Sequence, residues 1–272
     1  CMNLEEMGFE IEASHHECAI GQHEIDFKYV DALDGADKIM TLKLAVKTLA
    51  QKNGLHATFM PKPVYGVAGS GMHLNMSPFK DGRNVFYDEG GQRQLSKTAR
   101  SFIAGLLRHA DGFTALTNPL VNSYKRLGAG YEAPRYKAWS SANRSTLIRI
   151  PSVRGQSTRV ELRSPDPSCN PYLAIGLVLA AGLDGIENRM VLSAPVNKNL
   201  FDPSMAEGLG LETLPASLEE AVQAAEESEF LRRVLPEQLA SRYFTEELKR
   251  CEALKHASDP VEYERTHYFN AI

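Results

Sequence analysis

Residues 158–188 read TRVELRSPDPSCNPYLAIGLVLAAGLDGIEN, and this stretch decides the fold class. Charged and apolar side chains alternate over residues 158–163, which is typical of a strand that packs one face on a core. After a loop rich in proline, Asn170 and Pro171 form a good N-cap and first turn for a helix to about Asn188. That helix is apolar nearly all round, so we expect it to be buried at the centre of the protein.

Helix caps, helical spacing of apolar residues and period-two alternation recur along the rest of the chain. Further helices are expected at residues 37–53, at 96–110 (N-cap Ser96, with Gly112 just past the end), at 217–235 behind a capping box, and at 236–256. Residues 4–12 resemble a helix end, capped by Gly8, that leads into a strand, and further strands are expected at 23–29, 55–60, 72–77 and 146–150. Because helices and strands are interspersed without a βαβ rhythm, we predict one α+β domain over residues 1–272 with a mainly antiparallel sheet.

Composition excludes several classes of protein. The 272 residues carry 34 acidic and 30 basic side chains, a formal net charge of −4, which argues against direct nucleic-acid or anionic-membrane binding. The four cysteines show no C-x-x-C spacing, and the longest apolar stretch, 172–183, is too short for a membrane helix. No signal peptide opens the chain, so we predict a cytoplasmic protein. Because it begins with Cys1 and not Met, we expect a piece of a longer polypeptide.

Three of the expected strands carry a file of polar side chains opposite an apolar file. The polar files are Arg159, Glu161 and Arg163; His73, Asn75 and Ser77; and Glu24, Asp26 and Lys28. Such a file is either the solvated side of an antiparallel sheet or the wall of a polar cavity. Imidazole, amide and repeated guanidinium groups favour the cavity.

Two kinds of ligand site are compatible with these files. Glu17, Glu24, His73 and Glu161 would give hard oxygen donors with one nitrogen, which suits Mg²⁺ or Mn²⁺ more than zinc; ordinary surface acids are the alternative. Five arginines (Arg144, Arg149, Arg154, Arg159 and Arg163) fall close together and suit phosphate or carboxylate, unless they serve surface solvation or ion pairs.

Common nucleotide-binding loops are missing from the sequence. Neither a Walker loop nor a G-x-G-x-x-G after a strand occurs, which disfavours P-loop and Rossmann sites. Gly69-Ser70-Gly71 either cradles a ligand by close backbone approach or only turns the chain.

Ten motifs occur in a fixed order: EASHHE (12–17), GQHEIDFKY (21–29), ATFMPKP (57–63), GSGMH (69–73), NSYKRL (122–127), GYEAP (130–134), NRS (143–145), IRIP (148–151), RVELR (159–163) and DP-x-x-NPYLA (166–174). With them the chain resembles the catalytic C-terminal domain of bacterial type I glutamine synthetases along most of its length. The resemblance implies a curved, mainly antiparallel sheet flanked by helices. It also implies nitrogen assimilation by synthesis of glutamine from glutamate, ammonia and ATP through a γ-glutamyl phosphate.

The resemblance further implies a role for each matching residue. Two or more Mg²⁺ or Mn²⁺ ions per site are implied, with Glu17 and Glu24 as ligands on the glutamyl phosphate side and His73 and Glu161 as ligands on the ATP side. Gly69, Arg126 and Arg163 are similar to glutamate-binding residues, and Arg144, Arg159 and Arg163 to catalytic ones. The nucleotide would lie along Glu12, Tyr29, Asn75, Ser77, Arg144, Arg149 and Arg159. Glu132 resembles the acid of a flap that closes over glutamate and takes a proton from ammonium.

The chain also departs from the family pattern. Ala68 stands where the family usually has Asn, which predicts weaker glutamate binding, and Phe201 replaces the Tyr of the adenylylated subfamily. The small N-terminal β-grasp domain and an E-x-E strand would lie upstream of Cys1. The resemblance implies a dodecamer of two hexameric rings, with nitrogen-regulatory transcription factors as candidate partners. A γ-glutamyl–amine ligase and a non-catalytic scaffold are the alternative functions.

Overall fold

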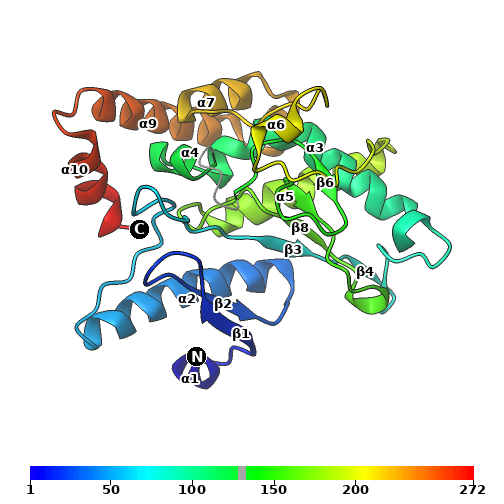
Figure 1. Ribbon diagram of the computed structural model, residues 1–272, viewed down its shortest axis with the longest axis horizontal. Helices are drawn as coiled ribbons and strands as arrows, with labels where there is room; N and C mark the ends of the chain where they lie inside the picture. Colours follow the sequence, from blue (N-terminus) through cyan, green and yellow to red (C-terminus); the bar gives the residue numbers. More distant parts are fainter. Residues whose placement is uncertain (128–132) are drawn as a thin grey trace.

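The computed structural model describes residues 1–127 and 133–272 (Figure 1). Its α-helices are α1 (Met2–Glu6), α2 (Ala32–Lys52), α3 (Lys97–Thr117), α4 (Val121–Leu127), α5 (Pro171–Glu187), α6 (Pro203–Ala206), α7 (Leu218–Glu227), α8 (Glu229–Val234), α9 (Glu237–Lys255) and α10 (Pro260–Glu264). Its strands are β1 (Ile11–His16), β2 (His23–Phe27), β3 (Leu74–Met76), β4 (Phe79–Lys80), β5 (Arg83–Asn84), β6 (Trp139–Ser140), β7 (Ile148–Arg149) and β8 (Val160–Leu162). Three short helical turns complete the list: η1 (Gln92–Gln94), η2 (Gly155–Ser157) and η3 (Arg265–Phe269).

The strands confirm the predicted α+β class. In the described part of the chain they form a hairpin of β1 and β2, a sheet in the order β3-β8-β7-β6, and a small hairpin of β4 and β5. All pairings are antiparallel except that of β6 with β7. The strands are shorter than the period-two segments of the sequence, and they are divided among separate sheets.

The core is built on the close crossing of α3 and α5. A Cβ atom on Gly105 of α3 would overlap the carbonyl oxygen of Ala181 and lie 2.8 Å from the Cα of Gly185. A Cβ atom on Gly185 would in turn overlap the carbonyl oxygen of Ser101. The two backbones are therefore in contact, which only glycine allows at both positions.

One face of the four-stranded sheet packs on these two helices. Leu74 of β3, Ile148 of β7 and Leu162 of β8 belong to the same buried cluster as Phe102 of α3 and Val178 of α5. Figure 1 shows β3 and β8 next to α5. Because side chains alternate along a strand, the opposite face of the sheet is left for the charged residues.

Most predicted helices are confirmed, including the one that was expected at the centre. The Asn170 side chain accepts hydrogen bonds from the backbone N–H groups of Tyr172 and Leu173, as an N-cap does. The Ser96 side chain caps α3 in the same way. The α5 helix is buried where it meets α3, but Tyr172 and Leu183 are exposed.

Three predicted helix boundaries are wrong. The helix expected at 37–53 begins earlier, at Ala32, with Asp31 at the N-cap position. The helix expected to stop before Gly112 continues to Thr117, and the missing side chain of Gly112 leaves room for Ser228, whose Oγ would lie 2.7 Å from a Cβ there. Ser228 also divides the single helix expected at 217–235 into α7 and α8, and its Oγ accepts a hydrogen bond from Leu231 N. Contact with a distant segment explains the glycine at position 112, whereas the break at Ser228 is a local N-cap.

The predicted strand at residues 55–60 is also wrong. The segment forms no strand, and its contacts are with the end of the chain. Phe59 N donates to Ile272 O over 3.2 Å, and the His56 ring stacks on Phe269 with 4.8 Å between centroids.

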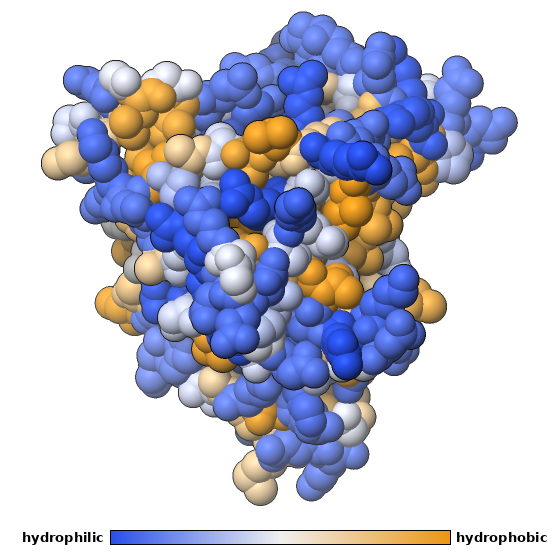
Figure 2. Space-filling view, turned by 90° about the vertical axis from the view of Figure 1, so that its right-hand side faces the viewer, coloured by the Kyte–Doolittle hydropathy of each residue, from blue (hydrophilic) through white to orange (hydrophobic). Residues whose placement is uncertain are grey.

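The helices and the surface were checked for long apolar regions. None of the helices within 1–127 and 133–272 combines the length and the apolar character needed to cross a bilayer. Figure 2 shows one face that is mostly hydrophilic, with separate apolar patches between the charged regions.

The glycine crossing yields a stability prediction. We expect Gly185→Ala to lower the free energy of unfolding by about 1–3 kcal/mol, because the added methyl group forces the two helices apart. The control is Gly176→Ala on the same helix, where a Cβ meets open space. It should raise the stability by about 0.5–1 kcal/mol. Urea unfolding followed by circular dichroism measures both, and equal stability of the two variants would contradict the crossing.

Candidate functional site

The loop of residues 61–71 lies against Arg126 of α4. A Cβ on Gly69 would overlap Pro61 O and lie 3.3 Å from Arg126 Cγ, and a Cβ on Gly71 would lie 2.5 Å from Arg126 Nη2. Neither glycine has a positive φ. Both glycines are therefore needed for close packing against the protein's own atoms, and binding of a ligand by Gly69-Ser70-Gly71 stays a prediction.

Arg126 places a buried positive charge under this loop. Its Nη1 donates to Ser164 O over 2.7 Å and its Nη2 donates to Arg163 O over 3.0 Å. Burial lowers the pKa of the guanidinium to about 10, so the group is still charged at neutral pH. Two carbonyl oxygens solvate the cation, and the buried acid Asp166 lies close enough to oppose the lowering of its pKa.

Glu161 of β8 is the centre of a second group of charges. Its Oε2 lies 2.5 Å from Arg149 Nη1, its Oε1 lies 2.6 Å from Arg163 Nη1, and His73 Nδ1 lies 3.5 Å from Oε1. Glu161 and Arg163 are each 4% exposed, so for them the solvated-face alternative does not hold. The structure thus brings together four of the residues that the sequence singled out.

His73 is held in its neutral form. Burial, and after it the positive charges of Arg163 and Arg126, keep the pKa of the imidazole well below its ordinary value. A neutral imidazole has a free lone pair on one ring nitrogen, which is the form that binds a metal ion.

Polar residues continue from this centre along β3. Arg159 Nε donates to Asn75 Oδ1 over 3.2 Å, and Asn75 is paired with Glu161 across the two strands. Ser77 Oγ donates to Thr158 O over 3.0 Å and accepts from Asn84 Nδ2 over 2.9 Å. No local pattern predicts Asn84, because its role depends on contacts with segments more than seventy residues away.

The β1–β2 hairpin carries a cluster of possible ligands. The Glu24 carboxyl is hydrogen-bonded to that of Glu17, and one donor atom each of His15, Glu24 and Asp26 lie within 4.8 Å of one another. Burial, the bond to Glu17 and the charge of Asp26 raise the pKa of Glu24 to about 8. The sequence predicts Glu17 and Glu24 as ligands but not His15 or Asp26. The signals were the two-residue spacing from Glu24 to Asp26 and the strand register that sets His15 opposite Glu24.

A hydrogen bond from Gln22 connects the hairpin to the 61–71 loop. Gln22, between β1 and β2, donates from Nε2 to Gly69 O over 2.9 Å. This bond places the turn of the hairpin directly beside the loop that covers Arg126.

The remaining predicted residues are more peripheral. Glu12 lies in a bulge of β1 and Tyr29 lies past the end of β2, so both are at the open end of the hairpin, away from Glu17. Arg144 is exposed, yet its charge contributes to the lowered pKa of His73. Glu132 lies outside the described residues.

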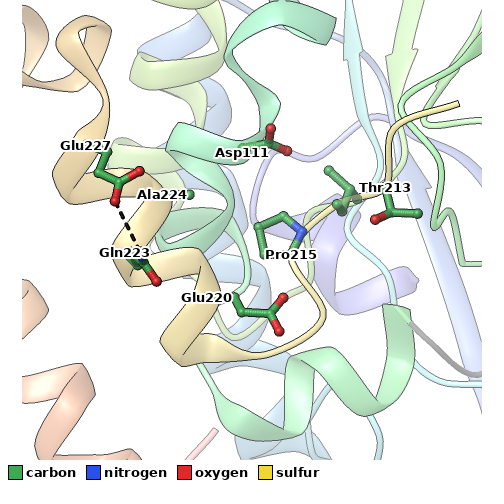
Figure 3. Close-up of a pocket in the computed structure, with 8 residues that line it drawn as sticks. Asp111, Thr213, Pro215, Glu220, Gln223, Ala224 and Glu227 are labelled. Carbon is green, nitrogen blue, oxygen red and sulfur yellow. Dashed lines mark hydrogen bonds between the residues drawn. The ribbon is translucent and has the colours of Figure 1, made fainter.

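A surface hollow elsewhere does not match this chemistry. It lies between α3, α7 and residues 213–215 and has a volume of about 320 Å³ (Figure 3). Its charged lining residues are the carboxylates Asp111, Glu220 and Glu227. Such a lining repels phosphate and carboxylate ligands, so the candidate site is the Glu161 and Arg126 region.

Known proteins match this chain over nearly its whole length. The family described as "Glutamine synthetase, catalytic domain" matches residues 1–268. Glutamine synthetase of Clostridium saccharobutylicum is 58% identical over 88% of this chain and 55% of its own length, and that of Staphylococcus aureus is 51% identical over 98% and 60%. The solved structure "Apo GmaS without ligand" is 36% identical with a TM-score of 0.87, over 100% of this chain and 62% of that one. The chain therefore spans little more than half the length of these curated relatives.

The raised pKa of Glu24 yields a pH prediction. The folded state holds this proton more tightly than the unfolded state, whose pKa is near 4.5, so the stabilisation is complete below that pH and is lost as the pH rises through about 8. We expect the free energy of unfolding, measured with urea and a metal chelator, to fall between about pH 5 and pH 8. Glu24→Gln should flatten this slope, and parallel profiles for the two proteins would contradict the assignment.

Proposed function

This chain belongs to the glutamine synthetase catalytic-domain family, and from that premise we propose that it catalyses the ATP-dependent ligation of ammonia to L-glutamate. The products would be L-glutamine, ADP and phosphate. The observation that carries the proposal is the buried carboxylate of Glu161, held between Arg149 and Arg163 beside neutral His73. A site for two anionic substrates needs such a concentration of fixed charge and metal donors.

The charges fit the two substrates. Glutamate and ATP are both anions, and they must be brought together against their mutual repulsion. Arg126, Arg149 and Arg163 offer guanidinium groups that bind carboxylate or phosphate in planar pairs of hydrogen bonds. Arg126 is already dehydrated by burial, so an anion at Gly69 would interact with it at low effective dielectric.

The donor set also fits divalent cations. Glu17 and Glu24 would hold one ion and His73 and Glu161 another, and oxygen donors with one imidazole suit Mg²⁺ or Mn²⁺. Each Glu161 oxygen is bound by one guanidinium and keeps a second lone pair for a metal ion. Bound ions would neutralise charge on the transferring phosphoryl group and so lower the barrier to its transfer.

Glutamate would be activated before ammonia attacks. Its γ-carboxylate oxygen attacks the terminal phosphorus of ATP, so a P–O bond forms to glutamate and the bond to ADP breaks. The acyl phosphate then reacts with ammonia: a C–N bond forms and phosphate leaves. We assign glutamate binding to Gly69, Arg126 and Arg163, and the proton taken from ammonium to Glu132.

The nucleotide would extend from this centre. Arg144 and Arg159 would stabilise the charge of the transferring phosphoryl group, because both lie near His73 or Asn75. Arg149, Asn75 and Ser77 would border the phosphates. Glu12 and Tyr29, at the open end of the hairpin, would meet the far end of the nucleotide.

A second candidate function has specific support. The neighbouring solved structures are of GmaS, a γ-glutamylmethylamide synthetase, at 36% identity. A γ-glutamyl–amine ligase of this kind would use an organic amine in place of ammonia. The 51–58% identity to glutamine synthetases favours ammonia. A non-catalytic scaffold is the third candidate.

The relatives' greater length bears on the active form. We propose that a β-grasp domain and an E-x-E strand precede residue 1 in the active protein and complete the metal sites. We further propose a cytoplasmic dodecamer of two hexameric rings, with nitrogen-regulatory transcription factors as candidate partners.

The amine specificity is directly testable. Phosphate release from Mg-ATP and glutamate should depend on ammonium and be much slower with methylamine, in a form of the protein extended upstream. This chain alone should release little phosphate, since each metal site then lacks a carboxylate. Faster release with methylamine would favour the amine ligase. Release by neither form would favour the scaffold.

The role of Glu161 is tested separately. Glu161→Ala in the extended protein should lower the ammonium-dependent rate about 100-fold or more, because it removes a metal ligand and the partner of two arginines. Glu246→Ala, which removes an exposed carboxylate on α9, is the matched control and should leave the rate unchanged. Full activity of the Glu161 variant would exclude the metal assignment.

A further inference from the structure

We propose that Glu264 of α10 is a positioning residue for the glutamate site, which it reaches through the side chain of Asn122 and the 61–71 loop. The inference rests on the proposed function, because that loop carries Gly69. Glu264 lies near the far end of the chain, 199 positions from Tyr65, with which it is hydrogen-bonded.

Glu264 is a buried carboxylate with partners from two other segments. It is 1% exposed, its Oε1 lies 2.7 Å from Lys125 Nζ, and its Oε2 accepts hydrogen bonds from Asn122 Nδ2 at 3.0 Å and from the Tyr65 hydroxyl at 3.1 Å. Asn122 and Lys125 belong to α4, and Tyr65 belongs to the 61–71 loop. Losing this carboxylate would leave its donors without an acceptor, which is costly inside a protein.

Asn122 passes this contact on to the loop. Its Oδ1 accepts from Lys62 N over 2.7 Å, and its Nδ2 donates both to Lys62 O, at 3.1 Å, and to Glu264. The amide therefore uses both of its N–H groups and its oxygen. The Glu264 carboxylate and the Lys62 backbone both require Nδ2 on the same side, so Glu264 holds the amide in the orientation in which it binds both backbone groups of Lys62.

The backbone at Lys62 determines where Gly69 lies. The preceding carbonyl, Pro61 O, accepts a hydrogen bond from Ser70 N over 2.8 Å, and Gly69 packs against the same oxygen. These contacts close the two ends of the loop on each other. A shift at Lys62 is consequently transmitted to Gly69, which rests on Arg126.

The same helix connects Glu264 to Arg126 by a second route. Lys125, the ion-pair partner of Glu264, immediately precedes Arg126 on α4, and Asn122 lies one turn earlier. Figure 1 shows α10 at the edge of the molecule, with α4 and the segment before β3 between it and the sheet. Glu264 thus holds both the loop above the guanidinium and the helix that carries it.

The first measurement is amide hydrogen exchange over residues 61–71 in this chain. In Glu264→Ala we expect exchange at Lys62 and Ser70 to become about 10-fold faster, because their acceptors lose their fixed positions. Glu264→Gln keeps an acceptor for Asn122 and should restore most of the protection. The matched control is Glu247→Ala on α9, which removes a buried carboxylate paired with Arg250 and should leave exchange in the loop unchanged.

The second measurement is ligand affinity by calorimetry. Glu264→Ala should bind glutamate about 10-fold more weakly, since small displacements of a site have large effects, and should bind Mg-ATP as the wild type does. Glu264→Gln should recover glutamate affinity, and Glu247→Ala should lose none. Should Glu264→Ala not fold, Glu264→Met fills the same space without an acceptor, and the same results are expected of it.

Two results would overturn the inference. One is wild-type exchange in the loop of the Ala and Met variants. The other is an equal disturbance of the loop by Glu247→Ala, which would make the effect one of general stability. Failure of the wild-type protein extended upstream to bind glutamate would instead contradict the proposed function, and the exchange data would still decide whether Glu264 positions the loop.

Discussion

The contact between the backbones of α3 and α5 is the constraint on which the rest of the structure depends. Gly105 and Gly185 let the two helices approach until the atoms of one backbone touch the other. The two helices together form an apolar surface, and the hydrophobic side chains of β3, β7 and β8 pack against it. The orientation of the sheet, and with it the direction of every charged residue on its other face, follows from this packing.

The charged face is organised around a buried carboxylate. Glu161 would be costly to bury alone, and the guanidiniums of Arg149 and Arg163 offset that cost. Burial, helped by the same positive charges, keeps the pKa of His73 well below its ordinary value and the imidazole neutral. Structure and chemistry are thus linked, because the ion pairs that make burial tolerable also leave the imidazole in the form that binds metal ions.

The residues of the proposed site come from two separate sheets and from a helix. The β1–β2 hairpin contributes Glu17 and Glu24, the four-stranded sheet contributes Glu161, and α4 contributes Arg126. Gln22 and the 61–71 loop join the hairpin to the rest. A site assembled in this way can bind several anions and cations at once, which a ligation driven by ATP requires.

The sequence by itself determined the fold class, most helices and the identity of the charged residues. Alternation along 159–163 was enough to set Glu161 and Arg163 on one face, because a strand repeats every two residues. Caps such as Asn170 marked helix starts for an equally local reason. Only the tertiary structure decided that Gly112 lies inside a helix, that residues 55–60 contact the chain end, and that Asn122 connects Glu264 to Lys62. Each of these depends on a partner distant in the sequence, and local periodicity carries no record of which distant segments the packing of the core brings together.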